Sequence, residues 1–394
     1  MRLFSILRGC LLFLANCSLV PSGKVPAVSG ADAPGSGAWQ PGWLEIHHID
    51  AGQAASTLIV GPTGRTLLVD AGEADWQDNA GALVVGAYIK GVLGSSHLDT
   101  VLVSHFHLDH TGYPGYGGLW HLVNQQGFTV GKLLHRDLSR YPGEGSGTLV
   151  HWRAYLAGDG RSLLHPEVAT LGEGQIDLGP GVAVRLVAMD GNGLLEAAGP
   201  DGDPAPPSEN DYSVAFVLRF GLLDYFSGGD LSGETLVSDF GYSYHDIEYA
   251  VAPLVGDVDV YRVNHHGSAH SSSPTFLAEL RPRVSIIEVG DVSPDGHPHQ
   301  AAVDRLAATG ALYLTERGNP TTNLRGGRVV GHVVLRTEDG IDYWVADDHY
   351  VAADPPRVDA DSDGYFQEAD PDDTRSVVVP APRGGCDPAH QTCR

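Results

Sequence analysis

The amino-acid sequence predicts a layered α/β fold. Short runs of β-branched and apolar residues alternate with stretches of helical composition, which is the pattern of strands packed against helices. A hydrophobic share of 42% in 394 residues is enough for a substantial core. One arrangement recurs along the chain: an apolar run stops, and polar side chains able to bind a metal follow directly. In layered α/β folds such strand ends share one edge, where binding sites are assembled.

The first predicted strands form a hairpin followed by a third strand. Residues 43–49 alternate in polarity, and residues 56–60 make a second strand. The sequence Gly-Pro-Thr-Gly at 61–64 predicts a turn before a third strand at 66–69. This third strand ends in Asp70, the first of the polar residues at strand ends.

A predicted helix at 81–93 leads to a strand at 100–103, after which metal-capable side chains are densely packed. Alternate residues of an extended chain point the same way, so the first two histidines of this cluster can face one ion. After the chain bends, the following aspartate and histidine can face another. Imidazole and carboxylate suit zinc, and the same donors also bind manganese or iron. A surface cluster without metal is the alternative. The cluster consists of His105, His107, Asp109 and His110.

Two later strand ends carry further candidates. A pair of strands predicted within 213–226 ends in Asp230, and a strand at 258–263 ends in His265 and His266. A carboxylate such as Asp230 can bridge two ions about 4 Å apart, so that one activates water while the other polarises the scissile group. Taken alone, Asp230 could equally be a turn-forming aspartate after two glycines.

Two long segments are predicted to be loops. Residues 139–180 are punctuated by glycine and poorly periodic, and residues 190–209 are rich in proline. The first of these could cover a substrate cleft, and it could equally be a surface loop with no role.

The first 41 residues are predicted to precede the folded domain. A basic start and an apolar stretch at 11–20, too short for a comfortable membrane span, predict an export signal in residues 1–20. Residues 21–41 have the composition of a flexible spacer. The segment before Cys17 loosely resembles a lipoprotein signal, so a lipid anchor at this cysteine is one alternative. The protein is therefore expected outside the cytoplasm, whether secreted, periplasmic or lipid-anchored at the cell surface.

Residues 349–394 predict an acidic extension. Its aspartates reproduce the spacing of a calcium loop, with ligands at positions one, three, five and twelve. We expect either a calcium-stiffened attachment module or a disordered acidic tail. Cys386 and Cys393 could close a small disulfide loop outside the cytosol, the alternative being two idle thiols. The candidate calcium ligands are Asp359, Asp361, Asp363 and Asp370.

The charge balance restricts the partners. The chain carries 49 acidic side chains against 24 Lys and Arg, a formal net charge of −25. A protein whose affinity depends on neutralising phosphates is expected to show a basic stripe, and the sequence shows none. Long nucleic acid held non-specifically is therefore disfavoured, although bound metal ions can reverse the field locally at a phosphate site.

The motif His105-x-His107-x-Asp109-His110, preceded by a strand that ends Asp70-Ala71-Gly72, resembles the metallo-β-lactamase superfamily of metal-dependent hydrolases. The resemblance implies an αββα sandwich, in which two packed sheets carry helices outside, with a dinuclear site at one rim. It also implies that Asp70 orients the metal-binding loop and is not itself a ligand.

Further motifs are similar to the ComEC/Rec2 branch, the hydrolase domains of the bacterial DNA-uptake channel and their free-standing relatives. The similarity spans about residues 43–345, which places a hydrolase domain at 42–348. In chain order, the motifs are Asp50-Ala51-Gly52-Gln53, the segment 62–72, Asn210-Asp211-Tyr212-Ser213, Ser227-Gly228-Gly229-Asp230, His265-His266-Gly267-Ser268 and Gly296-His297-Pro298-His299.

The resemblance implies a role for each matching residue. His105 and His107 would bind the first metal, Asp109 and His110 the second, and Asp230 would bridge them. Of the two adjacent histidines, His265 is preferred as the last ligand of the second metal, with His266 and Ser268 facing substrate or packing. The superfamily's third histidine of the first site has no clear counterpart, and Asn210 or Asp211 stands near that place. His297 and His299 are assigned to phosphate binding or proton donation, the alternative being a structural role.

These observations predict an exported hydrolase with two divalent metal ions, zinc or manganese, that cleaves a small or polymeric phosphodiester with metal-bound hydroxide. One alternative is hydrolysis of a carboxylic ester, lactone or lactam, because fold does not dictate substrate. Another is a non-catalytic binding protein attached to the cell surface.

Overall fold

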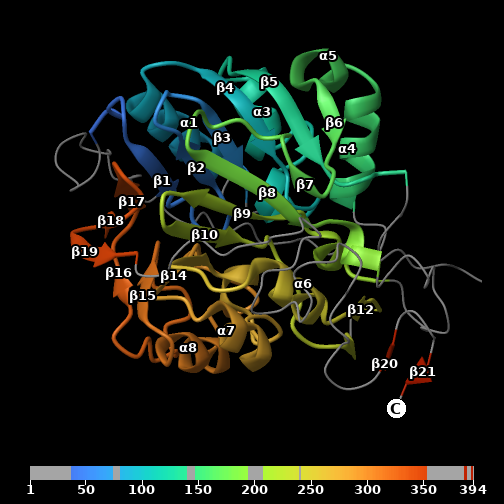
Figure 1. Ribbon diagram of the computed structural model, residues 1–394. Helices are drawn as coiled ribbons and strands as arrows, with labels where there is room; N and C mark the ends of the chain where they lie inside the picture. Colours follow the sequence, from blue (N-terminus) through green and yellow to red (C-terminus); the bar gives the residue numbers. More distant parts are fainter. Residues whose placement is uncertain are drawn as a thin grey trace, which may run out of the picture. The chain divides into compact units, whose positions relative to one another are not determined.

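Two large β-sheets pack against each other at the centre of this computed structural model (Figure 1). All described residues belong to one compact unit that begins at Pro34. The structure describes residues 37–73, 80–139, 147–193, 207–238, 241–352, 386–387 and 392–393.

The first sheet has nine strands in the order β19-β18-β17-β1-β2-β3-β4-β5-β6. Strands β3 to β6 run parallel to one another, whereas the strands from β19 to β3 are joined by antiparallel pairings. The predicted hairpin and third strand are confirmed as β1 to β3. The strands are β1 (Leu44–His48), β2 (Thr57–Val60), β3 (Thr66–Val69), β4 (His97–Leu102), β5 (Thr129–His135), β6 (Pro166–Val168), β17 (Val333–Thr337), β18 (Asp342–Val345) and β19 (Asp348–Val351).

The second sheet has eight strands in the order β16-β15-β14-β13-β10-β9-β8-β7. Five neighbouring strands from β10 to β16 are parallel, so their carboxyl ends lie along one edge. The strands are β7 (Gly172–Glu173), β8 (Val182–Ala188), β9 (Ala215–Phe220), β10 (Leu223–Ser227), β13 (Val260–Arg262), β14 (Val284–Ile287), β15 (Ala311–Leu314) and β16 (Arg328–Val329).

The central core lies between the two sheets and follows from the alternation of side chains along each strand. In β3, Leu67 and Val69 join the cluster that also contains Phe216 and Ile286 of the second sheet. Leu68, between them in sequence, packs on the opposite face with the helices. Strands covered on both faces read as uninterrupted apolar runs, which explains the compositions of β2 and β3.

Helices cover the outer face of each sheet, so the predicted αββα sandwich is confirmed. In Figure 1, α1, α3, α4 and α5 lie with the first sheet, and α6, α7 and α8 lie below the second. The short α2 (Leu108–Thr111) follows β4. The longer helices are α1 (Ala80–Leu93), α3 (Gly118–Asn124), α4 (Gly147–Ala157), α5 (Gly160–Leu164), α6 (Ile247–Val255), α7 (Pro274–Leu280) and α8 (Gln300–Ala307).

The prediction of a loop across residues 139–180 is wrong. Helices α4 and α5 occupy much of this segment, and Leu149, Trp152 and Leu156 of α4 are buried against the first sheet. Their spacing of three and four residues is helical, but glycines at the helix ends obscure the pattern in the sequence.

The smaller elements include three short 3₁₀ turns and two further strand pairs. The turns are η1 (Asp190–Gly193), η2 (Glu209–Tyr212) and η3 (Asn264–Gly267), and one strand pair joins β11 (Leu236–Val237) to β12 (Ser243–Tyr244). In the other pair, β20 (Cys386–Asp387) runs antiparallel to β21 (Thr392–Cys393), with Cys386 opposite Cys393. The disulfide between these cysteines stays a prediction.

Several predictions fall on other parts of the chain. The export signal with Cys17 and the calcium ligands Asp359, Asp361, Asp363 and Asp370 lie outside the described residues, and the predicted domain boundaries stay predictions. Within the described part of the chain, no helix combines the length and apolar character needed to cross a membrane.

Candidate metal centre

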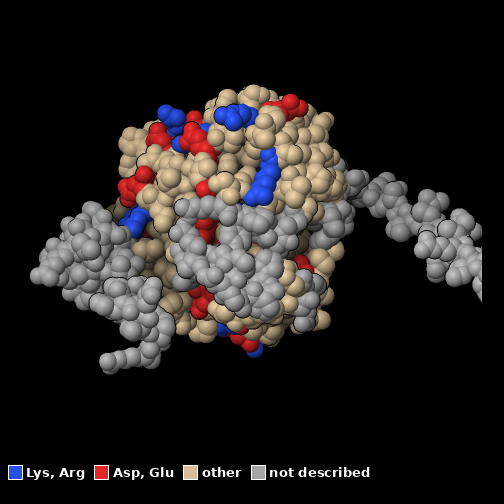
Figure 2. Space-filling view, turned by 90° about the vertical axis from the view of Figure 1, so that its right-hand side faces the viewer, with Lys and Arg blue, Asp and Glu red and all other residues tan. Residues whose placement is uncertain are grey.

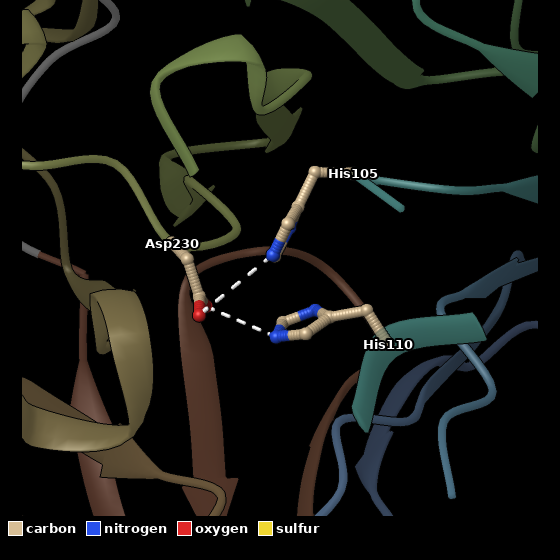
Figure 3. Close-up of side chains that lie close together, drawn as sticks. All are labelled: His105, His110 and Asp230. Carbon is tan, nitrogen blue, oxygen red and sulfur yellow. Dashed lines mark ion pairs between the residues drawn. The ribbon is translucent and has the colours of Figure 1, made fainter. Parts of the chain in front are cut away.

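Strand ends from both sheets meet at one rim and bring the predicted metal-binding residues together. From the first sheet, the chain leaves β4 into the segment that holds His105 and His110. From the second, β10 is followed by Asp230. Figure 3 shows both histidine rings directed at the Asp230 carboxylate.

Asp70 orients this site from behind, as the resemblance implies. Its Oδ1 accepts a hydrogen bond of 2.7 Å from the backbone N–H of Ser104, and its Oδ2 accepts one of 2.7 Å from the Ser104 hydroxyl. The same Oδ2 lies 2.8 Å from Nδ1 of His110. Because a carboxylate accepts, Nδ1 of His110 carries a proton, and Nε2, the nitrogen that would bind a metal, faces Oδ1 of Asp230 at 3.1 Å.

A close backbone approach explains why the Asp-Ala-Gly sequence after β3 ends in glycine at position 72. The backbone of residues 70–73 runs against the metal-binding segment, with hydrogen bonds from Ala71 N to His110 O and from Glu73 N to Leu108 O. A Cβ atom on Gly72 would lie 1.7 Å from the carbonyl oxygen of Asp109. Only glycine permits this approach.

Two clusters of ligand atoms share Asp230. In the first cluster, Nε2 of His105 lies 3.1 Å from Nδ1 of His107 and 3.9 Å from Oδ2 of Asp230. In the second cluster, Nε2 of His266 lies 3.3 Å from Oδ2 of Asp109 and 3.2 Å from Nε2 of His110. Two groups of three could each hold a cation: His105, His110 and Asp230, and Asp109, His110 and His266.

The chemistry of the donors fits divalent metals. Pairs of imidazole nitrogens approach within 3.2 Å of each other around a carboxylate that is only 2% exposed. Such a buried arrangement leaves lone pairs facing one another, and a cation between them would satisfy them all. Nitrogen and carboxylate ligands together suit zinc or manganese.

The electrostatics of the cluster also favour cation binding. Burial lowers the pKa of the His105 ring well below its usual value, so the ring is neutral at pH 7. Burial opposes ionisation of Asp230, but His110, His265 and His266 outweigh it and hold the pKa of this carboxyl well below its usual value. Burial also opposes protonation of His110, whose pKa is nevertheless raised by Asp230 and Asp70. A bound cation would displace this proton.

The structure brings His266, and not the preferred His265, together with Asp109 and His110. His266 is 1% exposed, and its Nδ1 donates to the Glu288 carbonyl oxygen at 2.7 Å, which leaves Nε2 free to face Asp109. Both histidines have left-handed backbone, with φ of 53° and 51°. Such conformations cost about 1–3 kcal/mol each and cluster at functional sites. Here they direct the two adjacent rings to different surroundings.

The structure separates Asn210 from Asp211. Nδ2 of Asn210 lies 3.3 Å from Nε2 of His265. Asp211 turns away from the metal cluster, and its Oδ2 accepts hydrogen bonds from the backbone N–H and the Nδ1 of His245 at 3.0 and 2.8 Å. Burial raises the pKa of Asp211 to about 6. Asp211 belongs to neither group of potential metal ligands, and one oxygen of its carboxylate binds His245.

Ser268 is placed differently from the prediction that it faces substrate. It is 1% exposed, and its hydroxyl accepts a hydrogen bond of 3.3 Å from the backbone N–H of His270. Its side chain therefore stabilises the turn after His266 and is not presented to a substrate.

His297 and His299 lie beside the cluster. The His297 ring stacks on His266 with centroids 6.0 Å apart and packs edge-on against His265 and His299 at 5.3 and 4.9 Å. Its Nδ1 is buried and has no hydrogen-bond partner among the described residues. Burial lowers the pKa of both rings, that of His297 well below its usual value.

A buried ion pair that the sequence reasoning missed supports the second cluster. Arg262 donates through Nη1 to the Gly229 carbonyl oxygen at 2.9 Å and through Nη2 to Glu288 Oε2 at 3.1 Å. The other carboxylate oxygen of Glu288 lies 2.8 Å from Nδ1 of His48 in the first sheet. Arg262 thus joins the residue before Asp230 to the residue whose carbonyl holds His266. The signal in the sequence was a charged residue at the end of each of two apolar strands.

Comparisons of the sequence place this chain near two curated proteins, and no family model matches it. It is 30% identical over 130 residues to ComE operon protein 3 of Bacillus subtilis, a match that covers 32% of this chain and 15% of that protein. It is 41% identical over 99 residues to Recombination protein 2 of Haemophilus influenzae, covering 25% of this chain and 11% of that protein. The chain therefore spans a small part of the length of both relatives.

Solved structures with a similar arrangement have low sequence identity. They include the metallo-β-lactamase fold protein YhfI from Bacillus subtilis, with 11% identity, a TM-score of 0.36 and coverage of 77% of this chain and 99% of that one. The diiron β-hydroxylase CmlA from Streptomyces venezuelae has 15% identity, a TM-score of 0.39 and coverage of 75% and 54%. Human tRNase Z, short form, has 14% identity, a TM-score of 0.34 and coverage of 61% and 91%.

Proposed function

We propose that this chain, a metallo-β-lactamase-superfamily protein of the ComEC/Rec2-like branch, is a dinuclear metal-dependent phosphodiesterase. One observation carries the proposal: the Asp230 carboxylate lies within 4.0 Å of four imidazole rings from two sheets. A carboxylate in this position supports two cations held close enough to act on one substrate.

The residues of the chain would divide the work as follows. His105 and His107 hold one ion, and Asp109, His110 and His266 hold the other. Divalent ions bound there would lower the pKa of a water molecule and polarise the phosphoryl oxygens of the substrate. Asp70 keeps His110 in the tautomer that binds metal, and Glu288 does the same for His266 through its backbone carbonyl.

His299 could donate a hydrogen bond to the substrate in exchange for the one it makes to the Asp295 backbone. Its Nδ1 accepts a hydrogen bond of 3.0 Å from the backbone N–H of Ala269, so in the neutral ring the proton resides on Nε2. His299 is half-buried beside His297, next to the metal-binding histidines. A neutral donor in this place would bind a phosphoryl oxygen or protonate the leaving group. His297 is buried beside it, its Nδ1 has no hydrogen-bond partner in the described part of the chain, and it would bind the same phosphate.

A small diester fits the charge of the chain better than a polymer. The formal net charge is −25. On the face in Figure 2, the visible Lys and Arg side chains are scattered among acidic ones and form no continuous stripe. Binding a polymeric backbone depends strongly on such a stripe, whereas a single phosphodiester needs only the metal ions and a few donors. A polymeric substrate is the other outcome of the test below.

The test is turnover of bis(p-nitrophenyl) phosphate by the metal-loaded full chain, alongside single- and double-stranded DNA, nitrocefin and a lactone panel. We expect hydrolysis of the diester that a chelator abolishes, with Asp230→Asn lowering kcat/KM by at least about 10²-fold. Substitutions outside the ligand shell alone typically cost 10–100-fold in metal affinity or activity. Turnover of nitrocefin or lactones with none of any diester would favour the ester or lactam alternative. Silence toward all of these substrates would favour a binding protein.

We also place the protein outside the cytoplasm, as secreted, periplasmic or anchored through a lipid on Cys17. The support is the apolar stretch at 11–20 and the absence of cysteine between Cys17 and Cys386. Fusion of the first 41 residues to a reporter that is active only after export tests this. Labelling with a radioactive fatty acid that is lost in Cys17→Ser would identify the anchor.

A further inference from the structure

We propose that the two adjacent histidines serve different metal ions, with His265 binding the ion held by His105 and His107, and that Asn210 positions His265 for this role. The inference rests on the dinuclear centre of the proposed function. It assigns a ligand that the resemblance leaves open, and it reverses the expectation that His265 joins Asp109 and His110.

The Asp230 carboxylate provides the first argument. Its Oδ1 lies 3.1 Å from Nε2 of His110, in the second cluster. Its Oδ2 lies 3.9 Å from Nε2 of His105 and 3.8 Å from Nε2 of His265. His265 therefore approaches the same oxygen as His105 at a similar distance, as His266 also does at 4.0 Å. Of the two adjacent histidines, His266 is held in the second cluster by its contacts with Asp109 and His110, whereas His265 has no such contact among those described.

The second cluster is complete without His265. Asp109, His110 and His266 form a tight group of ligand atoms, and Asp230 adds a fourth donor. Apart from His110, which the second cluster uses, the first cluster has His105, His107 and Asp230 among the described residues. An additional imidazole there would give both ions four protein donors, the number typical of a fully bound zinc ion.

His265 stands at the rim of the first cluster, with a side chain that is 14% exposed. It belongs to neither tight group of ligand atoms, so metal binding would draw the ring inward. Its backbone N–H donates to the Gly229 carbonyl at 3.2 Å, which fixes the residue beside Asp230. The left-handed backbone at both histidines allows neighbouring side chains to diverge in this way.

Asn210 provides an independent argument. It is 2% exposed, its Nδ2 lies 3.3 and 3.5 Å from the two nitrogens of the His265 ring, and its Oδ1 has no hydrogen-bond partner among the described residues. A buried amide oxygen without a partner is costly. Rotation of the amide by half a turn, with the His265 ring turned so that Nδ1 is the nearer nitrogen, would let Oδ1 accept from Nδ1–H and leave the Nε2 lone pair for the ion.

The backbone of Asn210 is held firmly enough for this positioning. The preceding residue, Glu209, forms a bidentate ion pair with buried Arg136, with distances of 2.7 and 2.6 Å. Glu209 also accepts a hydrogen bond of 3.1 Å from the backbone N–H of Phe106, within the segment that carries His105 and His107. One carboxylate therefore fixes Asn210 relative to the first cluster.

Counting bound ions tests the assignment without any substrate. Full-length variants are titrated with Mn²⁺ or Zn²⁺ alone, and the tightly bound ions are counted by elemental analysis after desalting. The native chain should bind two ions, and His265→Ala and His266→Ala should each keep one. The combination of His105→Ala with His265→Ala should still keep one ion, because both residues serve the same ion. The combination of His105→Ala with His266→Ala should keep none.

Matched variants separate positioning from folding. Asn210→Ala should lower the affinity for one of the two ions about tenfold, while the unfolding midpoint of the metal-free protein stays unchanged. The His299 ring lies beside the cluster and contacts Ala269 and His297. The His299→Ala variant should therefore keep both ions. Circular dichroism establishes that each variant is folded. If His265→Ala is not folded, His265→Gln replaces it in the ion count.

Three results would overturn the inference: a native chain that binds one ion, a His265→Ala variant that binds two ions with native affinity, or a double variant of His105 and His265 that binds none. A His265→Ala variant with two ions and a raised KM for the diester would make His265 a substrate ligand. These results are distinct from failure of the proposed function, in which two ions bind as described and no diester is hydrolysed.

Discussion

At the residue scale, the tautomer of each histidine decides which of its nitrogens can bind a metal. An imidazole can bind a metal only through a nitrogen without a proton, so each ligand needs a partner that holds its other proton. Asp70 provides this partner for His110, and the carbonyl of Glu288 provides it for His266. The sequence motif identifies the histidines, whereas their partners come from strands far away in the chain.

Replacing Asp70 with Asn tests this principle. The amide keeps the shape but cannot accept from Ser104 N–H, Ser104 Oγ–H and His110 Nδ1–H together, so His110 loses its fixed tautomer. We expect metal affinity to fall about 10–100-fold, measured by competition with a chromogenic chelator. Asp99→Asn is the control, because Asp99 accepts from Thr66 at the opposite end of the same strand pair. Equal affinities for the native and Asp70→Asn proteins would contradict the role of Asp70.

At the element scale, the site depends on how closely two loops approach. The segment after β3 and the segment after β4 leave parallel neighbouring strands and touch at Gly72 and Asp109. The closeness follows from the parallel pairing, since both chains must leave the sheet at the same edge. A side chain at Gly72 would therefore move the metal-binding segment itself.

Gly72→Ala should displace Asp109 and His110 together. A Cβ atom 1.7 Å from a backbone oxygen cannot be accommodated by a side-chain rotation, so the loops must separate. We expect a loss of about 1–3 kcal/mol in the free energy of unfolding and weaker binding of the ion at Asp109 and His110, measured by urea denaturation and metal titration. Gly91→Ala is the control, since a Cβ atom there meets nothing within 4 Å in helix α1. Native metal affinity in Gly72→Ala would show that the loops are free to separate.

The elements also show how far sequence carries the prediction. The strands before Asp70, His105, Asp230 and His265 could be predicted because apolar runs followed by polar residues are a local signal, and the resemblance that these motifs suggest is confirmed by the two sequence relatives. The choice between His265 and His266 could not, because it depends on two left-handed backbone conformations. Helix α4 was missed because glycines at its ends obscure its pattern, and the Arg262–Glu288 pair was missed because neither residue belongs to a motif.

At the scale of the whole molecule, buried carboxyl groups away from the metal ligands set the response of stability to pH. Glu248 of α6 is fully buried and accepts hydrogen bonds from Asn264 Nδ2 and from the backbone N–H groups of Ser272 and Ser273. Burial raises its pKa from 4.5 to about 7. Because the folded-state pKa is the higher one, the stabilisation is complete below pH 4.5 and is lost as the pH rises through 7.

This shift predicts that the metal-free protein loses stability between pH 5 and pH 8. A shift of this size corresponds to about 3 kcal/mol from Glu248. Glu248→Gln should flatten the dependence by a similar amount, because an amide does not titrate. Asp211 and Asp50, whose pKa values are raised to about 6 and about 7 by burial, still act in both proteins, so some slope remains. The measurement is urea denaturation in a chelator at both pH values. Glu279→Gln, at an exposed position of α7, should show the same pH dependence of stability as the native protein. If Glu248→Gln also shows the native pH dependence, the assignment to Glu248 is refuted.

The division of the ligands between the two sheets has a consequence for how the protein matures. One sheet contributes the histidines before and within α2, and the other contributes Asp230 and His266. Neither set of ligands is complete alone, so full coordination of two ions requires that the two sheets have docked. Bound ions would then link the sheets and stabilise the docked state over partly folded ones.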